Sequence, residues 1–385
     1  MHAYFYQSGI SRTGGKSVMK TAGIVLRNFK NGLSELDFSS SDAFLKAGYP
    51  FEEVRLLSRK DREAFLKAAE GLAAESENLV VIAEKSLLPS AREWLSEKFN
   101  TNFLQGTLSG AGLFEKENCS LFLVSPDSGE SGAEYVRNVC VPFLEKKYST
   151  RFDRIVLRAV GAEKERIKEL LQEALRMSGD KLTYNDKERY GESVVEILYD
   201  SSAPKMLADG VLRLFAEGLG DAVYALDDTP LEKRLVQLLK LRGKKISVAE
   251  SFTGGGVGRR IVSVPGASEV YFEGLNTYDE RAKIKRLGVS EYTLRTVGAV
   301  SDETAYEMAA GLIASGDCDI SVATTGLAGP KSDRTELPVG LAYIAVGLKE
   351  KVYVYRYRFE GTREEITETA INYALFLAYR QLKNL

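Results

Sequence analysis

Short apolar runs alternate with amphipathic segments along the first third of this chain. Three of the runs are typical of buried strands: 21–26, 79–83 and 120–124. Two stretches between them carry apolar residues at helical spacing: 61–74 and 90–99. Because parallel strands are joined by helical crossovers, this order predicts an α/β layer domain with a largely parallel sheet at residues 1–149.

The middle of the chain repeats the strand–helix order on a smaller scale. Strands are predicted at 154–161 and 193–199, and amphipathic helices at 162–177 and 203–219. This order predicts a small α+β module at residues 150–228.

A domain boundary is predicted near residue 228, where the residue types change to those of a helix start. Thr229 is expected to be the N-cap, and Pro230 the first residue of a helix that runs to about Leu241. The apolar run 244–250 then predicts a strand. Residues 229–385 are therefore expected to form a third domain, again of the α/β class.

Composition excludes several classes of protein. Of 385 residues, 44% are apolar and 28% are charged, which is enough for a core in each of several domains. The net charge of −2 gives no general basic character, so we expect no nucleic-acid partner. No apolar run approaches the roughly 18 residues that span a bilayer, and residues 1–7 lack a signal-peptide pattern. We expect a cytoplasmic protein without a membrane partner.

Cysteine and histidine usage narrows the possible chemistry. Cys119, Cys140 and Cys318 lack the spacing of a metal site or a disulfide framework, and are expected to be buried in a reducing compartment. The one histidine of the chain is His2, close to the first residue. A Ser-His-Asp mechanism, a Cys-His mechanism and a His-rich metal site are therefore not expected. A hydrolase built on this chain must take its base from Lys, Tyr, Asp or Glu.

Residues 246–256, ISVAESFTGGG, predict a buried strand that feeds a glycine-rich turn and then a helix. The hydroxyl of Ser251 is expected where free backbone N–H groups and the helix dipole converge. Such a place can activate a nucleophile, hold an oxyanion or seat a phosphate. The simpler interpretation is a tight strand-to-helix turn with a serine cap. The turn alone does not choose between them.

Three further tracts in the last domain have the composition of functional loops: 278–283, 298–303 and 324–330. The strands next to them are predicted at 270–272, 320–323 and 341–346. Ser301 is placed to cap the helix that continues through Ile313. Each tract could be ordinary turn chemistry. In an open α/β sheet, however, ligands bind beyond the carboxyl ends of the strands, so the set favours a ligand site.

Six motifs now stand in order in the last domain. They are Ala249-Glu250-Ser251-x-Thr253-Gly254-Gly255, Val264-Pro265-Gly266-Ala267-Ser268, Tyr278-x-x-x-Ala282-Lys283, Gly298-Ala299-Val300-Ser301, Thr325-Gly326-x-Ala328-Gly329-Pro330 and Pro338-Val339-Gly340. Over about residues 230–385 they resemble the carboxy-terminal domain of the CinA family, the nicotinamide-nucleotide amidohydrolase (NMN deamidase) domain. The resemblance implies hydrolysis of nicotinamide mononucleotide to nicotinate mononucleotide and ammonia, with no metal and no cofactor.

The resemblance also implies roles for residues of this chain. Ser251 would be the nucleophile and Lys283 the base, with Tyr278 beside them as a hydrogen-bonding or pocket residue. A lysine must be neutral to accept a proton, so burial or a nearby cation must lower the pKa of Lys283 from about 10.4. The implied substrate-binding residues, which would hold the oxyanion or phosphate or close the pocket, are Thr253, Gly254, Gly255, Ser301, Thr325, Gly326 and Arg363.

This chain departs from the family pattern around the implied site. Phe252 replaces a cysteine, and Asp279 and Glu280 replace Ser and Asn. Negative charge there would raise the pKa of the lysine and oppose its neutral form. The glycine-rich tract after Gly-Pro becomes Lys-Ser-Asp-Arg-Thr at 331–335, and Leu337 replaces a lysine. We expect these changes on substrate-facing loops, where they bear on the substrate and on the level of activity.

The rest of the chain resembles the family less closely. The middle module, 150–228, is similar to a KH-like connecting module. Residues 1–149 stand where the family has a molybdopterin-binding-like domain with metal-dependent ADP-ribose pyrophosphatase activity. The expected Gly-Thr-Glu and Thr-Gly-Gly-Leu-Gly-Pro-Thr-x-Asp-Asp signatures are absent. We expect a degenerate domain in which this activity is lost.

Three hypotheses of function follow. The first is an amidohydrolase that acts on nicotinamide mononucleotide or a related nucleotide amide. The second is a catalytically weak nucleotide-binding or scaffold protein, favoured by the altered loops and the degenerate first domain. The third is a nucleic-acid-associated competence or repair factor, which the near-neutral charge does not favour. The family resemblance alone suggests a homodimer.

Overall fold

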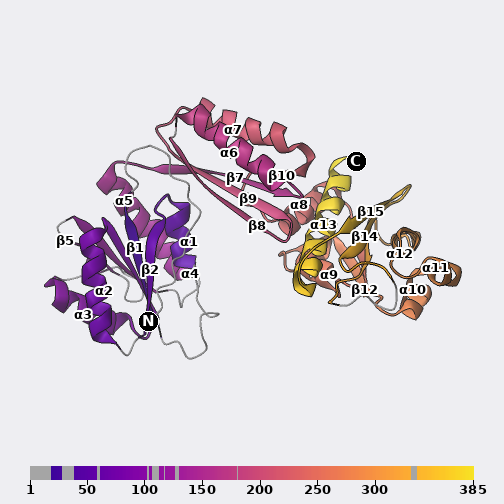
Figure 1. The fold of residues 1–385 in the computed structure, drawn as a ribbon, viewed down its shortest axis with the longest axis horizontal. Coiled ribbons are helices and arrows are strands. Elements are labelled where there is room, and N and C mark those ends of the chain that lie inside the picture. The colour runs from indigo at the N-terminus through magenta and orange to yellow at the C-terminus, as the bar shows by residue number, and fades with distance from the viewer. Residues whose placement is uncertain are drawn as a thin grey trace. The chain divides into compact units, whose positions relative to one another are not determined.

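In the computed structural model, the described residues form three β-sheets, each with associated helices (Figure 1). The predicted α/β class is confirmed. The structure describes residues 19–27, 39–58, 61–101, 104–105, 112–116, 118–125, 130–179, 181–330 and 336–385. His2 and the segment 331–335 lie outside these residues.

The first sheet has the strand order β2-β1-β3-β6-β5-β4. Its strands are β1 (Thr21–Arg27), β2 (Phe51–Ser58), β3 (Asn78–Ala83), β4 (Leu104–Gln105), β5 (Gly112–Lys116) and β6 (Cys119–Val124). Its helices are α1 (Ser39–Lys46), α2 (Arg62–Glu75), α3 (Leu88–Phe99), α4 (Glu130–Tyr135), the π-helix Val136–Cys140 and α5 (Val141–Tyr148). Strands β2, β1, β3 and β6 are parallel, β5 pairs antiparallel with β6, and β4 pairs antiparallel with β5, so the largely parallel prediction is confirmed.

Alternate residues of β1 explain why helices cover both faces of this sheet. Ile24 and Leu26 belong to a buried cluster that includes Phe65 of α2. Val25 belongs to a second cluster that includes Phe44 of α1. Because successive strand residues point to opposite faces, a continuous apolar strand requires a helical layer on each side.

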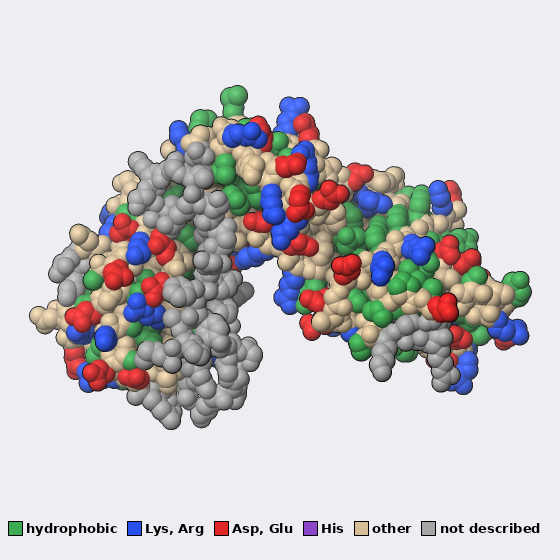
Figure 2. Space-filling view, viewed as in Figure 1, with side chains coloured by type: hydrophobic (Ala, Val, Ile, Leu, Met, Phe, Trp, Pro, Cys, Tyr) green, Lys and Arg blue, Asp and Glu red, His purple; other side chains and the backbone are tan. Residues whose placement is uncertain are grey.

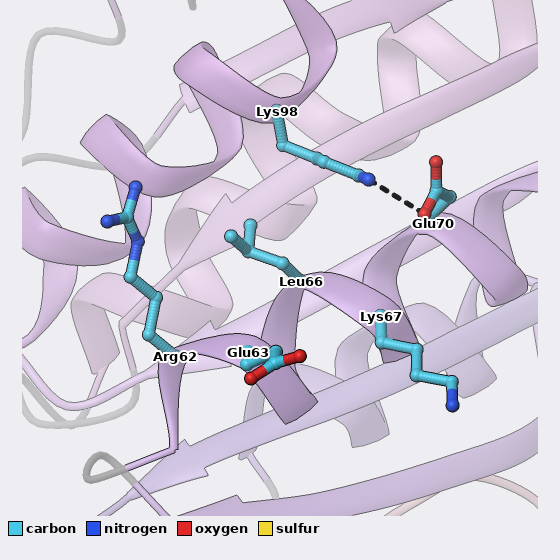
Figure 3. A pocket seen from close by; sticks show the side chains of 6 residues that line it. All are labelled: Arg62, Glu63, Leu66, Lys67, Glu70 and Lys98. Atoms are coloured by element: carbon cyan, nitrogen blue, oxygen red, sulfur yellow. Dashed lines mark ion pairs between the residues drawn. The ribbon is translucent and has the colours of Figure 1, made fainter.

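A shallow hollow lies on the outer side of α2 and α3 (Figure 3). Five charged side chains and Leu66 line it, and Lys98 forms an ion pair with Glu70 at 2.8 Å. The charged side chains that line it are of both signs, and Lys98 and Glu70 neutralise each other. The hollow is formed by helices that cover the first sheet, and none of the predicted site residues lines it.

The middle sheet has the order β10-β7-β9-β8. Its elements are β7 (Phe152–Val160), α6 (Lys164–Ser178), β8 (Leu182–Arg189), β9 (Glu192–Asp200), α7 (Lys205–Leu219), the 3₁₀ turn Gly220–Ala222 and β10 (Val223–Ala225). The sequence predicted β7, α6, β9 and α7. It missed β8, whose polar second half does not have the apolar pattern of a strand.

The third sheet has the order β12-β11-β13-β14-β15, with β12, β11 and β13 parallel. Its strands are β11 (Ile246–Glu250), β12 (Tyr271–Asn276), β13 (Ile320–Gly326), β14 (Leu341–Leu348) and β15 (Val352–Arg358). Its helices are α8 (Leu231–Arg242), α9 (Gly256–Val262), α10 (Glu280–Leu287), α11 (Glu291–Thr296), α12 (Asp302–Ala314) and α13 (Arg363–Lys383), with a 3₁₀ turn at Ala267–Glu269.

Two buried clusters divide these helices between the faces of the third sheet. Val248 and Val322 pack with α8, α9 and α13, whereas the neighbouring Ala249 and Ala323 pack with α12. Figure 1 shows α9 and α13 on one side of this sheet and α10–α12 on the other. This layering leaves the carboxyl ends of β11, β12 and β13 together at one edge.

One predicted cap is wrong. The N-cap of α8 is Pro230 and not Thr229, and no side chain caps this helix. Proline at this position has an extended backbone with ψ of 156°, so the helix begins one residue later, at Leu231. The cap predicted at Ser301 is confirmed, since its hydroxyl accepts a hydrogen bond from the Thr304 N–H.

By their contacts the residues form two compact units, which share the elements of the middle sheet. The first contains 1–155, 173–185 and 196–209, and the second contains 156–172, 186–195 and 210–385. The predicted domain limits after 149 and 228 stay a prediction. On the face shown in Figure 2, acidic and basic side chains are interspersed.

Three general features of the chain follow from its described residues. All three cysteines are buried and free, as predicted. Within the described ranges, no helix has the length and apolar character to cross a membrane. The same residues contain no group of three or more His, Cys, Asp or Glu side chains able to hold a metal ion.

Candidate active site

The predicted nucleophile and base lie together at the carboxyl edge of the third sheet. Ser251 directly follows β11, and Lys283 lies on α10, which begins four residues after β12. The Nζ atom of Lys283 lies 3.1 Å from the Oγ atom of Ser251, within hydrogen-bonding distance. Parallel strands deliver their following segments to the same edge, which explains how residues 32 positions apart meet.

Lys283 is buried, with only 1% of its surface exposed. Its Nζ donates to two backbone carbonyls, of Thr277 at 2.6 Å and of Tyr278 at 3.3 Å. Together with the Ser251 hydroxyl, these make three polar neighbours around one nitrogen. An ammonium group has three hydrogens for them, whereas a neutral amine has two hydrogens and one lone pair. The site therefore accommodates both protonation states.

Burial lowers the pKa of Lys283 to about 8, because the charged form loses its hydration. Glu280 and Asp279 act in the opposite direction and raise it, as the sequence predicted, but burial outweighs them. Asp279 is also engaged elsewhere, since it caps α10 and pairs with the Arg281 guanidinium at 3.0 Å. The two extra carboxylates therefore do not prevent a neutral lysine near physiological pH.

This pKa predicts the pH dependence of any reaction in which Lys283 accepts a proton. We expect kcat/KM to rise with pH and to reach half of its plateau near pH 8, since the neutral fraction grows through that value. The measurement is a pH–rate profile of ammonia release between pH 6 and about 10. A rate that falls as the pH rises through 8 would contradict a basic role for Lys283.

The backbone conformation of the Ser251 turn explains why it contains glycine at two positions. Gly254 and Gly255 both have positive φ, at 59° and 94°, which side-chain-bearing residues rarely adopt. The Gly254 N–H donates to the Ser251 carbonyl at 3.1 Å, closing a four-residue turn. The turn reverses the chain between β11 and α9 and leaves the Ser251 side chain half-buried.

The amide and hydroxyl donors expected to hold an anion are occupied by a side chain of the protein itself. The Glu250 carboxylate accepts hydrogen bonds from the Thr253 hydroxyl at 2.7 Å and from the Gly255 N–H at 3.0 Å. The Gly254 N–H is used within the turn. In this structure the Thr253 hydroxyl and the N–H groups of Gly254 and Gly255 are thus bonded within the turn, and the anion-binding role expected of these residues stays a prediction.

Two other donors in the turn remain available. In the described part of the chain, the backbone N–H groups of Phe252 and Thr253 donate to no acceptor. They follow the candidate nucleophile directly, where an oxyanion hole of an acyl-transfer site is commonly placed. The Phe252 side chain is buried in the core, so the substitution at this position does not place an aromatic ring in the solvent.

The other predicted binding residues line the adjoining loops. The Thr325 hydroxyl donates to the Ala299 carbonyl at 2.6 Å, which ties the end of β13 to the loop before Ser301. Ser301 is buried and engaged as a helix cap. Gly326 leaves no room for a side chain, because a Cβ there would lie 2.7 Å from the Leu341 carbonyl oxygen. The contacts of these residues are with the protein itself, and their role in substrate binding stays a prediction.

Arg363 and Tyr278 are both exposed. Arg363 is exposed at the start of α13 and donates to the Gly329 carbonyl at 2.7 Å, so it anchors the loop that precedes residues 331–335. The backbone carbonyl of Tyr278 accepts a hydrogen bond from Lys283, and 66% of the surface of Tyr278 is exposed. The altered segment 331–335 itself lies outside the described residues.

Sequence reasoning missed Glu250, Thr277 and Thr324 as functional residues. Thr324 accepts the Ser251 N–H at its carbonyl, at 3.0 Å, and its hydroxyl lies 2.7 Å from that of Thr253. A signal for Glu250 was present, since a charged residue ends an otherwise apolar strand. The backbone carbonyls of Thr277 and Thr324 accept hydrogen bonds from Lys283 and Ser251, and the residue type gives no indication of such a role.

Comparison with known proteins identifies the family. A family model described as the CinA C-terminal domain matches residues 228–382. A putative competence-damage inducible protein of Caldanaerobacter subterraneus subsp. tengcongensis is 31% identical over 300 residues, covering 78% of this chain and 71% of that protein. The chain belongs to the CinA family. Its candidate site lies wholly within the part that the CinA family model matches.

Two further similar proteins match this chain over part of its length. A putative competence-damage inducible protein of Caldicellulosiruptor saccharolyticus is 37% identical over 253 residues, 65% of this chain but only 61% of that relative. The match thus spans less than two thirds of that protein. The competence/damage inducible protein CihA from Agrobacterium tumefaciens, a solved structure, is 36% identical over 38% of this chain and 90% of its own, with a TM-score of 0.37.

Proposed function

We propose that this CinA-family protein is an amidohydrolase that converts nicotinamide mononucleotide to nicotinate mononucleotide and ammonia by a Ser-Lys mechanism. The observation that carries the proposal is the 3.1 Å approach of Lys283 Nζ to Ser251 Oγ, with the lysine buried. A buried lysine with a pKa of about 8 can accept a proton from a serine at physiological pH. The substrate comes from the family resemblance.

The acylation step uses only groups of this chain. Neutral Lys283 takes the proton of the Ser251 hydroxyl as the oxygen attacks the carboxamide carbon. The carbonyl oxygen becomes an oxyanion, for which the free N–H groups of Phe252 and Thr253 are the nearest candidates. Lys283 then returns the proton to the departing nitrogen, which leaves as ammonia and yields an ester on Ser251.

The deacylation step repeats the proton transfers with water. Water loses a proton to Lys283 and attacks the ester carbon, and the ester oxygen of Ser251 leaves with the proton that Lys283 returns. The Thr277 and Tyr278 carbonyls keep the amine in place through both steps, because each accepts one of its N–H groups. The net reaction consumes one water and releases one ammonia.

The first domain has no visible part in this reaction. We propose that its pyrophosphatase activity is lost, since the glycine-rich and paired-aspartate signatures are absent from the sequence. A homodimer, a cytoplasmic location and the absence of a nucleic-acid partner remain part of the proposal.

The test is turnover by the full-length wild-type protein. Nicotinamide mononucleotide is incubated with the protein at pH 8.5, and ammonia and nicotinate mononucleotide are quantified together. Equal amounts of the two products are expected. Nucleotide binding by calorimetry without either product would instead favour the catalytically weak nucleotide-binding or scaffold protein, for which the altered loops and the degenerate first domain are the support.

A further inference from the structure

We propose that the Glu250 carboxylate is a positioning residue, which holds the Ser251 turn in the geometry that Lys283 requires. The inference rests on the proposed function, because it assumes that Ser251 is a nucleophile. Glu250 is the last residue of β11 and directly precedes Ser251. Only 1% of its surface is exposed, so the carboxylate is removed from water beside the candidate site.

In the described part of the chain, this carboxylate accepts four hydrogen bonds, and all of them come from the segment after Ser251. The donors are the Thr253 hydroxyl at 2.7 Å and the N–H groups of Gly255 at 3.0 Å, Val257 at 3.1 Å and Gly258 at 2.9 Å. The carboxylate thus joins the end of the strand to both the turn and the first turn of α9. An ordinary N-cap residue bonds only the first amides of its own helix.

The energetics show why a carboxylate at this place is a specific choice. None of the four donors is a cation, so neutral groups and the positive end of α9 must replace its lost hydration. An isolated buried charge is strongly unfavourable, whereas one that accepts several hydrogen bonds is stable only while its donors keep their positions. If the turn changed its conformation, the buried Glu250 carboxylate would therefore lose hydrogen bonds.

A second set of contacts joins Glu250 to the lysine side of the site. Its backbone carbonyl accepts the Thr277 N–H at 2.8 Å, and the Thr277 carbonyl accepts a hydrogen bond from Lys283 at 2.6 Å. Through Thr253 the carboxylate is also linked to Thr324 of β13. One residue is thus bonded to the segments that carry both Ser251 and the groups that orient Lys283.

Replacement of Glu250 with glutamine tests the proposal with little change in volume. An amide accepts at only one of its two ends, so at least one N–H of the turn or of α9 would face an N–H₂ group. The readout is the labelling rate of Ser251 by a fluorophosphonate, which forms a bond from phosphorus to Oγ and releases fluoride and a proton. We expect labelling to slow by about 10- to 100-fold, the effect of misplacing a nucleophile.

The pH dependence of labelling separates positioning from an electrostatic effect. The carboxylates that raise the pKa of Lys283 are those of Glu280 and Asp279, whereas the Glu250 carboxylate is bonded to the turn and to α9. We therefore expect the midpoint of the labelling profile to stay unchanged in Glu250→Gln. A shifted midpoint would overturn the positioning role, because it would mean that the carboxylate acts through its charge on the lysine.

Glu307→Gln is the matched control. Glu307 accepts hydrogen bonds from the Ser290 N–H at 2.7 Å and the Thr293 hydroxyl at 2.6 Å, a similar arrangement at the start of α11. Its labelling rate should equal that of the wild type. If Glu250→Gln does not fold, Thr253→Val and Thr253→Ser replace it, since only the serine keeps a hydroxyl for Glu250. Thr253→Ser should be labelled faster than Thr253→Val, and equal rates in the two overturn the proposal.

The remaining outcomes separate this proposal from the proposed function. Wild-type labelling in Glu250→Gln overturns the positioning role and leaves the amidohydrolase standing. If the wild-type protein is labelled at Ser251 but releases no ammonia, the proposed substrate is wrong. The labelling rates of the variants then still decide the positioning role. No labelling of the wild type overturns both.

Discussion

Replacing Ser251 with alanine should lower kcat for ammonia release by about 10⁴- to 10⁶-fold, the usual effect of removing a catalytic nucleophile. Alanine lacks the oxygen that lies 3.1 Å from Lys283 Nζ, so no ester can form. The fold should remain, because Ser251 is half-buried and its backbone contacts do not need the side chain. The measurement is initial-rate kinetics together with nucleotide affinity by calorimetry.

The control for this variant is a serine of the same domain that the reaction does not use. Ser263 donates its hydroxyl to the Arg260 carbonyl at 2.7 Å on the exposed end of α9, and Ser263→Ala should retain full activity. Substrate affinity in Ser251→Ala should stay within a few-fold of wild type. Activity that survives in Ser251→Ala would mean that another group is the nucleophile.

Replacing Lys283 with methionine should lower kcat by about 10³-fold, within the range for loss of a general base. Methionine fills a similar volume in this buried position but cannot accept the serine proton. Lys285→Met is the matched control, since Lys285 is exposed on the same helix and should be dispensable. The pH–rate profile of any residual activity should lose its midpoint near pH 8.

An arginine at position 283 separates a base from a simple positive charge. The guanidinium group stays protonated at every accessible pH, so it supplies charge without accepting a proton. Lys283→Arg should therefore be as inactive as Lys283→Met. Substantial activity in the arginine variant would assign the lysine an electrostatic role and count against the Ser-Lys mechanism.

Local patterns in the sequence were sufficient for the fold class and for the positions of most elements. The runs that became β1, β3 and β6 are apolar without interruption, because helices cover both faces of a parallel sheet. The cap at Ser301 was predictable because a cap and its helix are adjacent in the chain. The polar strand β8 was not predictable, since its pairing and not its composition makes it a strand.

The motifs of the last domain were sufficient to name the candidate nucleophile and the candidate base, and the sequence contains no histidine other than His2. How these groups act depends on their surroundings in the folded chain. A lysine five residues after a tyrosine carries no sign in the sequence that it is buried, and burial is what lowers its pKa to about 8. The glycine-rich turn looked like an empty anion site, yet Glu250 accepts hydrogen bonds from the Thr253 hydroxyl and the Gly255 N–H. The effect on Lys283 arises only when folding buries it, and the Glu250 carboxylate meets its donors only when the strand, the turn and the helix have taken their folded conformations.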